Sequence, residues 1–144
     1  MSLCTFALLL SGWAKVAQGQ TALSVSGSPA PFTITTAGAG SQPAALTNSV
    51  TTYSVRAKAA AQKITAHLDA PMPLGTTLTV EMVAPAGATS MGAVSLDATD
   101  RNIVINIANV NTTQGITYVF SATVAAGVIP TLTRTVTFTE SIYP

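Results

Sequence analysis

Apolar and polar residues alternate along most of the chain, so that every second side chain is hydrophobic. The clearest case is the last segment, TLTRTVTFTESIYP (131–144), in which hydroxyl residues occupy every odd position from Thr131 to Ser141. Its even positions carry Leu132, Arg134, Val136, Phe138, Glu140 and Ile142. Period-two alternation is the pattern of a β-strand with one face in water and one face against a core. The pattern predicts that this segment closes a core, with Arg134 and Glu140 near the rim or paired with other residues.

The same alternation recurs in about eight or nine short segments that Gly, Pro, Asn and Asp separate. We expect the inward positions to include Tyr53, Val55, Ile64, Ala66, Leu68, Leu78, Val80, Met82, Ile103, Ile105, Ile107, Ile116, Tyr118 and Phe120. No segment has helical periodicity except RAKAAAQK (56–63), which at about two turns is too short to be stable alone. We expect a continued strand or a short bend there. The chain is therefore predicted to be all-β, an immunoglobulin-like β-sandwich of about eight to nine antiparallel strands.

The first residues have a different pattern. An apolar run from Leu3 to Leu10 is too short to cross a bilayer as a helix. The segment ends in Ala17-Gln18-Gly19, with small residues at the two positions that a signal peptidase inspects. We therefore predict a secretory signal peptide over residues 1–19 and a single domain over residues 20–144. No Lys or Arg precedes the apolar run, so a buried N-terminal segment is the alternative.

Charge is sparse, at 8% of the residues, and the only cysteine, Cys4, lies in the predicted signal peptide. Removal of residues 1–19 would leave five basic and five acidic residues: Arg56, Lys58, Lys63, Arg101 and Arg134 against Asp69, Glu81, Asp97, Asp100 and Glu140. This balance disfavours a nucleic-acid partner, which requires a basic patch. No transmembrane segment is expected after residue 19. We expect a secreted or bacterial cell-surface protein, with the periplasm as the alternative compartment.

Enzymatic chemistry has little support in the sequence. His67 is the single histidine, and Asp69 lies two residues further along the same predicted face. If residues 63–70 and 77–84 pair as a hairpin, His67 lies opposite Thr79, with Glu81 nearby. A Thr–His–Asp set on a flat sheet face has no pocket, and no nucleophile-elbow glycines are present. We therefore predict that the chain is not an enzyme.

Metal and cofactor sites are equally weakly indicated. One histidine, and no cysteine after residue 19, make a zinc site improbable. The turn DATDRN (97–102) brings together Asp97, Asp100 and Asn102, whose oxygens suit calcium, but the spacing matches no calcium loop and Arg101 would oppose the ion. Asx-turn hydrogen bonds are the favoured interpretation of this turn. No glycine-rich phosphate loop precedes a helix, so no cofactor is expected.

The pattern KITAHLDAPMPLGTTLTVEMVAP (63–85), with GAVSLD (92–97) and residues 116–139, resembles small exported bacterial β-sandwich proteins, to which no function is attached. The chain also resembles pilus subunits of the chaperone–usher kind, which are incomplete immunoglobulin-like sandwiches. Their last strand has alternating apolar residues and a tyrosine in the next-to-last position. Here Val136, Phe138 and Ile142 alternate, and Tyr143 is next to last. The chain departs from them in lacking a cysteine pair and a glycine about fourteen residues from the end, since Gly127 lies earlier.

In such subunits an alternating N-terminal arm donates a strand to the neighbouring copy, which satisfies an open sheet edge by β-augmentation. Residues 20–30 are the candidate arm or, alternatively, an ordinary first strand. The assembly candidates are Leu23, Val25, Phe32 and Ile34. The resemblance implies a structural or adhesive protein that self-assembles into a filament or surface layer, with other copies or cell-envelope components as partners. The alternative is a monomeric extracellular module that binds a glycan or envelope partner, with Tyr143 as its stacking residue.

Overall fold

The computed structural model describes residues 4–8, 22–35, 41–58 and 60–144, and nearly all of their regular structure is β-strand. The single exception among these residues is a short 3-10 turn, η1 (Val124–Ala126). The strands are β1 (Cys4–Leu8), β2 (Ala22–Ser26), β3 (Phe32–Ile34), β4 (Leu46–Ala57), β5 (Gln62–Leu68), β6 (Thr76–Met82), β7 (Thr89–Ser90), β8 (Val94–Ser95), β9 (Arg101–Ile107), β10 (Val110–Ala122), β11 (Leu132–Arg134) and β12 (Val136–Ile142). The prediction of an all-β chain is confirmed.

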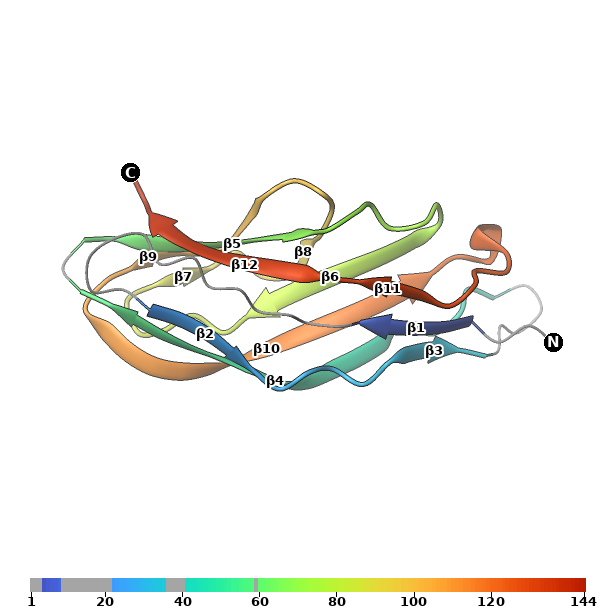
Figure 1. The fold of residues 1–144 in the computed structure, drawn as a ribbon, viewed down its shortest axis with the longest axis horizontal. Coiled ribbons are helices and arrows are strands. Elements are labelled where there is room, and N and C mark those ends of the chain that lie inside the picture. The colour runs from blue at the N-terminus through green and yellow to red at the C-terminus, as the bar shows by residue number, and fades with distance from the viewer. Residues whose placement is uncertain (1–3, 9–21, 36–40, 59) are drawn as a thin grey trace.

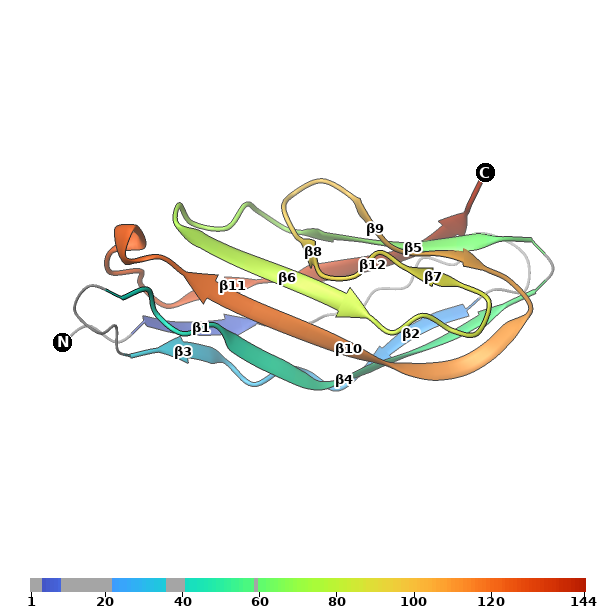
Figure 2. The same ribbon diagram turned by 180° about the vertical axis from the view of Figure 1, so that it is seen from behind.

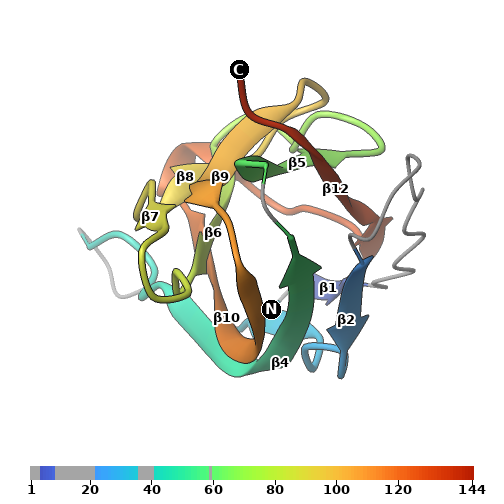
Figure 3. The ribbon, with the colours of Figure 1, turned by 90° about the vertical axis from the view of Figure 1, so that its left-hand side faces the viewer.

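Two larger antiparallel sheets form the body of the molecule. The first has the strand order β2-β4-β10-β6-β8, and the second has the order β12-β5-β9-β7 (Figures 1 and 2). The view along the long axis places these two sheets on opposite sides of the interior (Figure 3). A third sheet, β11-β1-β3, lies at one end, and its β1–β11 pairing is parallel. The architecture is that of a β-sandwich, with apolar side chains enclosed between the layers.

The core consists largely of the residues that alternation predicts to point inward. Tyr53, Ile64, Leu78, Val80, Met82, Ile103, Ile107, Ile116 and Tyr118 are all fully buried. The alternation fails in β9, where Ile103 and Val104 are both buried and Ile105 is only partly buried, and in β5, where Thr65 is buried as well as its neighbours. The pairing of β5 with β9 changes register on either side of Ile64. An irregularity of this kind rotates neighbouring side chains out of strict alternation, which also accounts for the burial of Thr65.

The hairpin considered for residues 63–70 and 77–84 does not form. β5 belongs to the four-stranded sheet and β6 to the five-stranded sheet, so the connection between them crosses from one layer to the other. His67 therefore lies opposite Thr137 of β12, and not opposite Thr79. Thr79 lies between Val119 of β10 and Ser95 of β8.

The C-terminal segment forms two strands, β11 and β12, with a break at Thr135. At this break, the Asp69 backbone N–H donates to the Thr135 carbonyl at 3.0 Å, and the Asp69 Oδ1 accepts from the Thr135 N–H at 3.1 Å. Val136 and Phe138 are buried as predicted, but Ile142 is 70% exposed and contributes nothing to the core. Arg134 lies at the rim, where its guanidinium donates from Nε and Nη2 to the Pro71 carbonyl at 3.2 and 3.0 Å.

Candidate functional site

β2, the candidate donor strand, is the edge strand of the five-stranded sheet. It pairs antiparallel with β4 and with no other described strand. Leu23 lies opposite Val55 and Val25 opposite Tyr53, and both side chains point toward the core. Leu23 is only 6% exposed. These two predicted assembly residues therefore pack against β4 of their own chain. This is the arrangement expected if β2 is an ordinary first strand of the domain.

A short linker joins β2 to the rest of the chain. Residues 27–31, with the sequence GSPAP, separate β2 from β3. Gly27 has φ +85°, which favours glycine, and a Cβ at this position would lie 3.2 Å from the Val50 carbonyl oxygen. Pro29 and Pro31 have no backbone N–H to donate to a ladder. The linker therefore ends β2 sharply, while β3 continues into another sheet.

The other two predicted assembly residues lie in that other sheet. Phe32 is 4% exposed, and its ring centroid lies 6.0 Å from that of Phe120, with the rings tilted by 37°. Ile34 is partly buried against the same core. Phe32 and Ile34 thus anchor β3 to the body of the molecule and do not share a strand or sheet with Leu23 and Val25. Residues 20 and 21 of the candidate arm lie outside the described residues.

β1 comes from the predicted signal peptide, of which only residues 4–8 are described. It lies between β3 and β11, with Phe6 in register with both Phe32 and Leu132. β1 is the only described strand that pairs with β3 and with β11 in this sheet. Removal of residues 1–19 would therefore leave one edge of β3 and one edge of β11 without a partner. Such edges are templates for a further strand.

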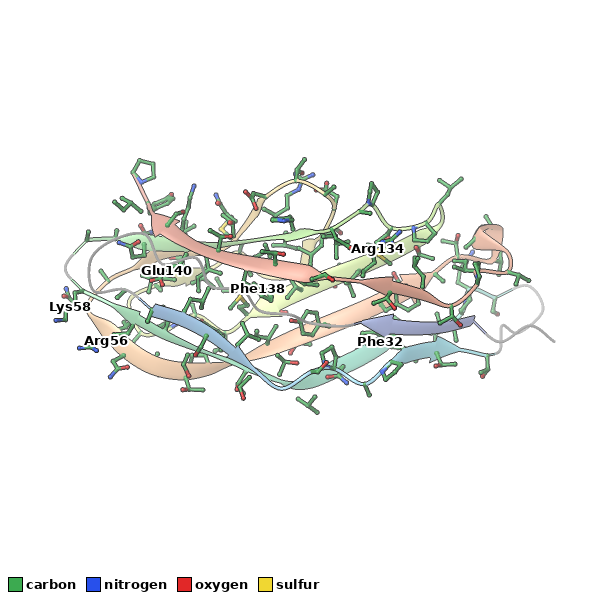
Figure 4. All side chains as sticks on the ribbon, in the orientation of Figure 1. Phe32, Arg56, Lys58, Arg134, Phe138 and Glu140 are labelled. Atoms are coloured by element: carbon green, nitrogen blue, oxygen red, sulfur yellow. The ribbon has the colours of Figure 1, made fainter. Side chains whose placement is uncertain are left out.

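β2 and β12 are the edge strands of the two opposite sheets, and they lie side by side (Figures 1 and 3). Among the described strands, no ladder joins them. We call this line of contact the β2–β12 seam. Phe138 and Glu140 lie on the side of β12 that faces β2 (Figure 4). Among the described residues, contact across the seam is therefore made by side chains and not by backbone hydrogen bonds.

Glu140 is an unusual residue for this position. Its Oε1 is buried and has no hydrogen-bond partner. Burial raises the pKa of the Glu140 carboxyl to about 7. The sequence placed Glu140 on the apolar face of the last strand and identified it as an interruption, but a rim location gave no reason to expect a buried oxygen. The signal that could have found it is a lone carboxylate within an alternating apolar face.

Away from the seam, His67 of β5 meets the turn of residues 97–102 that leads into β9, while Asp69 is hydrogen-bonded to Thr135 and Thr79 and Glu81 lie in β6. His67 Nδ1 lies 2.8 Å from Asp100 Oδ1. Asp97 Oδ1 accepts from the Thr99 N–H at 2.8 Å, which is the expected Asx turn, and Asp97 also pairs with Arg101. The hydrogen bond from Arg101, and then those from Thr99, hold the pKa of Asp97 well below its usual range. The described part of the chain contains no group of three potential metal-ligating side chains.

Tyr143, the candidate stacking residue, follows β12 and is partly exposed. Its N–H donates to the Ala61 carbonyl at 2.9 Å. Two surface crevices, of about 580 Å³ beside β8 and about 350 Å³ beside β11, do not include Tyr143 in their lining, and neither contains an aromatic residue. Neither crevice therefore places a bound ligand against the Tyr143 ring.

Two further observations concern membrane-spanning helices and known proteins. No helix among the described residues has the length and apolar character needed to cross a membrane. No protein-family model and no curated protein matches the sequence.

Proposed function

We propose that the chain is an exported, immunoglobulin-like structural subunit that assembles with other copies of itself at the bacterial surface by exchanging β2. In this exchange, β2 of one copy leaves its own β4 and pairs with β4 of the next copy. The proposal depends on one observation: β2 is an edge strand held by a single ladder and connected through a Gly/Pro linker. Strand exchange between identical chains is a low-cost route to assembly.

The exchanged contacts are the ones that already exist within one chain. Leu23 would occupy the same place opposite Val55, and Val25 the same place opposite Tyr53, on the neighbouring copy. Each exchange therefore conserves the apolar burial and the ladder hydrogen bonds of β2. Only the conformation of residues 27–31 and the concentration of copies decide between the closed monomer and the assembly.

The exchange could close into a two-fold dimer if it is reciprocal, or continue from copy to copy. We propose the continuing form, in which each copy donates β2 to one neighbour and accepts β2 from another, so that a head-to-tail chain grows unless the rotation closes a ring. The sparse charge of the chain, 8% of its residues, adds little repulsion between neighbouring copies. Both properties suit a filament or surface layer.

A paired-cysteine variant tests this proposal directly. Ser24 and Ser54 lie opposite each other on the outward face of β2 and β4. The variant Ser24→Cys/Ser54→Cys, in a Cys4→Ser background, places two thiols at cross-strand distance, within reach of a disulfide. If β2 is exchanged, oxidation links successive copies, and a non-reducing gel shows a covalent ladder. Negative-stain images of the same sample should show filaments or layers.

The matched control places the same pair of cysteines on strands that do not exchange. Thr77 of β6 and Ser121 of β10 are also directly opposite each other, and both strands are interior to the sheet. Thr77→Cys/Ser121→Cys should form the bond only within one chain. A monodisperse protein in which Ser24→Cys/Ser54→Cys also forms only internal bonds would overturn the proposal, as would assembly that survives deletion of residues 20–30 unchanged.

A further inference from the structure

Glu140 places a carboxyl group at the β2–β12 seam without giving it a partner. On the same face of β12, Val136 and Phe138 are buried apolar residues, and Ile64 of β5 lies directly opposite Glu140. The Oε1 atom has no contact with solvent and accepts no hydrogen bond from the described residues. A buried acceptor without a donor is costly, and an ionised one is more costly still. The side chain thus fits its site in the neutral form and fits poorly in the charged form.

No charged side chain of the neighbouring strands compensates it. On β5, Lys63 and His67 lie opposite Ser141 and Thr137, the residues of β12 that alternate away from Glu140. β2 carries no titratable residue. Burial is accordingly the only cause of the raised pKa of Glu140, with no contribution from a charge.

The strand of the opposite layer beyond β2 offers no partner either. Arg56, in β4, and Lys58, just after it, are both exposed, at the end of the strand (Figure 4). On β4 and β10, the inward-facing titratable residues are Tyr53 and Tyr118. The Tyr53 hydroxyl donates to the Val83 carbonyl, and the Tyr118 hydroxyl has no partner among the described residues.

Building on the proposed exchange of β2, we propose that Glu140 regulates it: the neutral carboxyl keeps the β2–β12 seam closed, and ionisation of the carboxyl loosens the seam and releases β2. Glu140 is only partly buried as a residue, but its Oε1 is shielded from solvent, and separation of β2 from β12 would let water reach this atom when the carboxyl is charged. β12 is paired with β5 at seven positions, whereas β2 is paired with β4 at five. The strand that yields is therefore β2.

The inference predicts that release, and with it assembly, increases as pH rises from about 5 to above 7. A carboxyl that ionises at its ordinary pKa in the open state and near 7 in the closed state raises the opening constant by up to about tenfold per pH unit in this range. Above that range the opening constant becomes independent of pH. The opposite trend, stronger assembly in acid, is excluded by the sign of this linkage.

Amide hydrogen exchange of β2 measures the release in the full chain. Protection factors, which already correct for the intrinsic pH dependence of exchange, are determined for Leu23 to Ser26 at pH 5, 6, 7 and 8 in a dilute sample. In the wild-type chain the protection should fall with pH and then level off. Glu140→Gln, which has nearly the same shape and cannot ionise, should give protection that is high and independent of pH. The control Glu81→Gln removes a charge from an exposed position of β6 and should behave like the wild type.

A second measurement, sedimentation of concentrated samples over the same pH series, separates the two proposals. If assembly occurs and both its extent and the β2 protection are the same in wild type and Glu140→Gln at every pH, regulation by Glu140 is wrong while strand exchange stands. If protection follows the predicted profile but no pH gives an assembly, strand exchange is wrong, and regulation of assembly falls with it. If protection and assembly both depend on pH in the wild type and lose this dependence only in Glu140→Gln, both proposals are supported.

Discussion

Gly75 and Ala126 lie so close together that a Cβ on Gly75 would be 2.9 Å from the Cβ of Ala126. The same added atom would lie 2.8 Å from the Thr123 Oγ1, and the Thr123 N–H donates to the Gly75 carbonyl at 2.8 Å. The connection between β5 and β6 therefore rests directly on the turn that follows β10. Since this connection also carries the chain from one sheet to the other, the contact fixes the end of the sandwich.

Gly75→Ala should destabilise the chain strongly. Gly75 has φ +79°, which costs a side chain about 1–2 kcal/mol, and the clash with Ala126 and Thr123 adds a further 1–3 kcal/mol, roughly, as overpacking does. Gly87→Ala is the matched control, because Gly87 has φ +82° but no atom within 4 Å of the added Cβ. Urea unfolding should show a larger loss for Gly75→Ala. Equal losses would mean that the contact with Ala126 yields without cost.

Tyr53 and Tyr118 should respond in opposite ways to the loss of their hydroxyl groups. Both residues are fully buried, but the Tyr53 hydroxyl donates to the Val83 carbonyl at 2.5 Å, whereas that of Tyr118 has no partner among the described residues. Tyr53→Phe should cost about 1 kcal/mol, because it removes a hydrogen bond and leaves an acceptor unsatisfied. Tyr118→Phe should be neutral or stabilising. Denaturant unfolding of the two variants decides this, and a loss from Tyr118→Phe as large as that from Tyr53→Phe would contradict it.

The stability of the chain should fall as pH rises from about 4.5 to 7. Burial raises the pKa of Glu140 from 4.5 to about 7, so the folded chain holds a proton in this window that the unfolded chain has lost. The stabilisation is complete below the unfolded value and is lost as the pH rises through the folded value, at no more than about 1.4 kcal/mol per pH unit. Asp97 does not contribute here, because its pKa is lowered and its titration lies below the window.

Glu140→Gln tests this dependence in unfolding experiments over pH 4–8. The variant should lose the decline between pH 4.5 and 7 and should be more stable than the wild type at pH 8, since an ionised buried group has been removed. Glu81→Gln should keep the decline. A wild-type stability that increases through this window would show that another group controls it.

Alternation along the sequence predicted the strands and most of the core, because the inward or outward position of a side chain in a strand is a local property. The partner of each strand is not local. β5 pairs with β12 and β9, far away in the sequence, and not with the adjacent β6. A connection of residues 69–75 is long enough to cross between layers or to turn back, and the residues themselves do not distinguish these two paths.

The candidate site divides in the same way. Leu23 and Val25 are recognisable from the sequence as one face of a strand, but only the structure places that strand beside β12. Glu140 was visible as an interruption of an apolar face, and its location at the seam follows from the packing of two edges that belong to different sheets. Likewise, the partner of Thr135 at the break between β11 and β12 is Asp69, a residue in the connection that follows β5.

The place that β1 occupies should accept a strand from outside once the predicted signal peptide has been removed. Mass spectrometry of the exported chain should find Gln20 as the first residue. β3 and β11 then have open facing edges, and a synthetic peptide of residues 2–9 should restore the ladder by β-augmentation.

A ligand that binds only the folded chain raises its melting temperature in proportion to the logarithm of its concentration above Kd. The peptide should therefore raise the melting temperature, whereas a control peptide with Phe6→Ser and Leu8→Ser, which lacks the apolar alternation, should not. Equal effects of the two peptides, or none from either, would show that residues 4–8 do not define a strand-binding site.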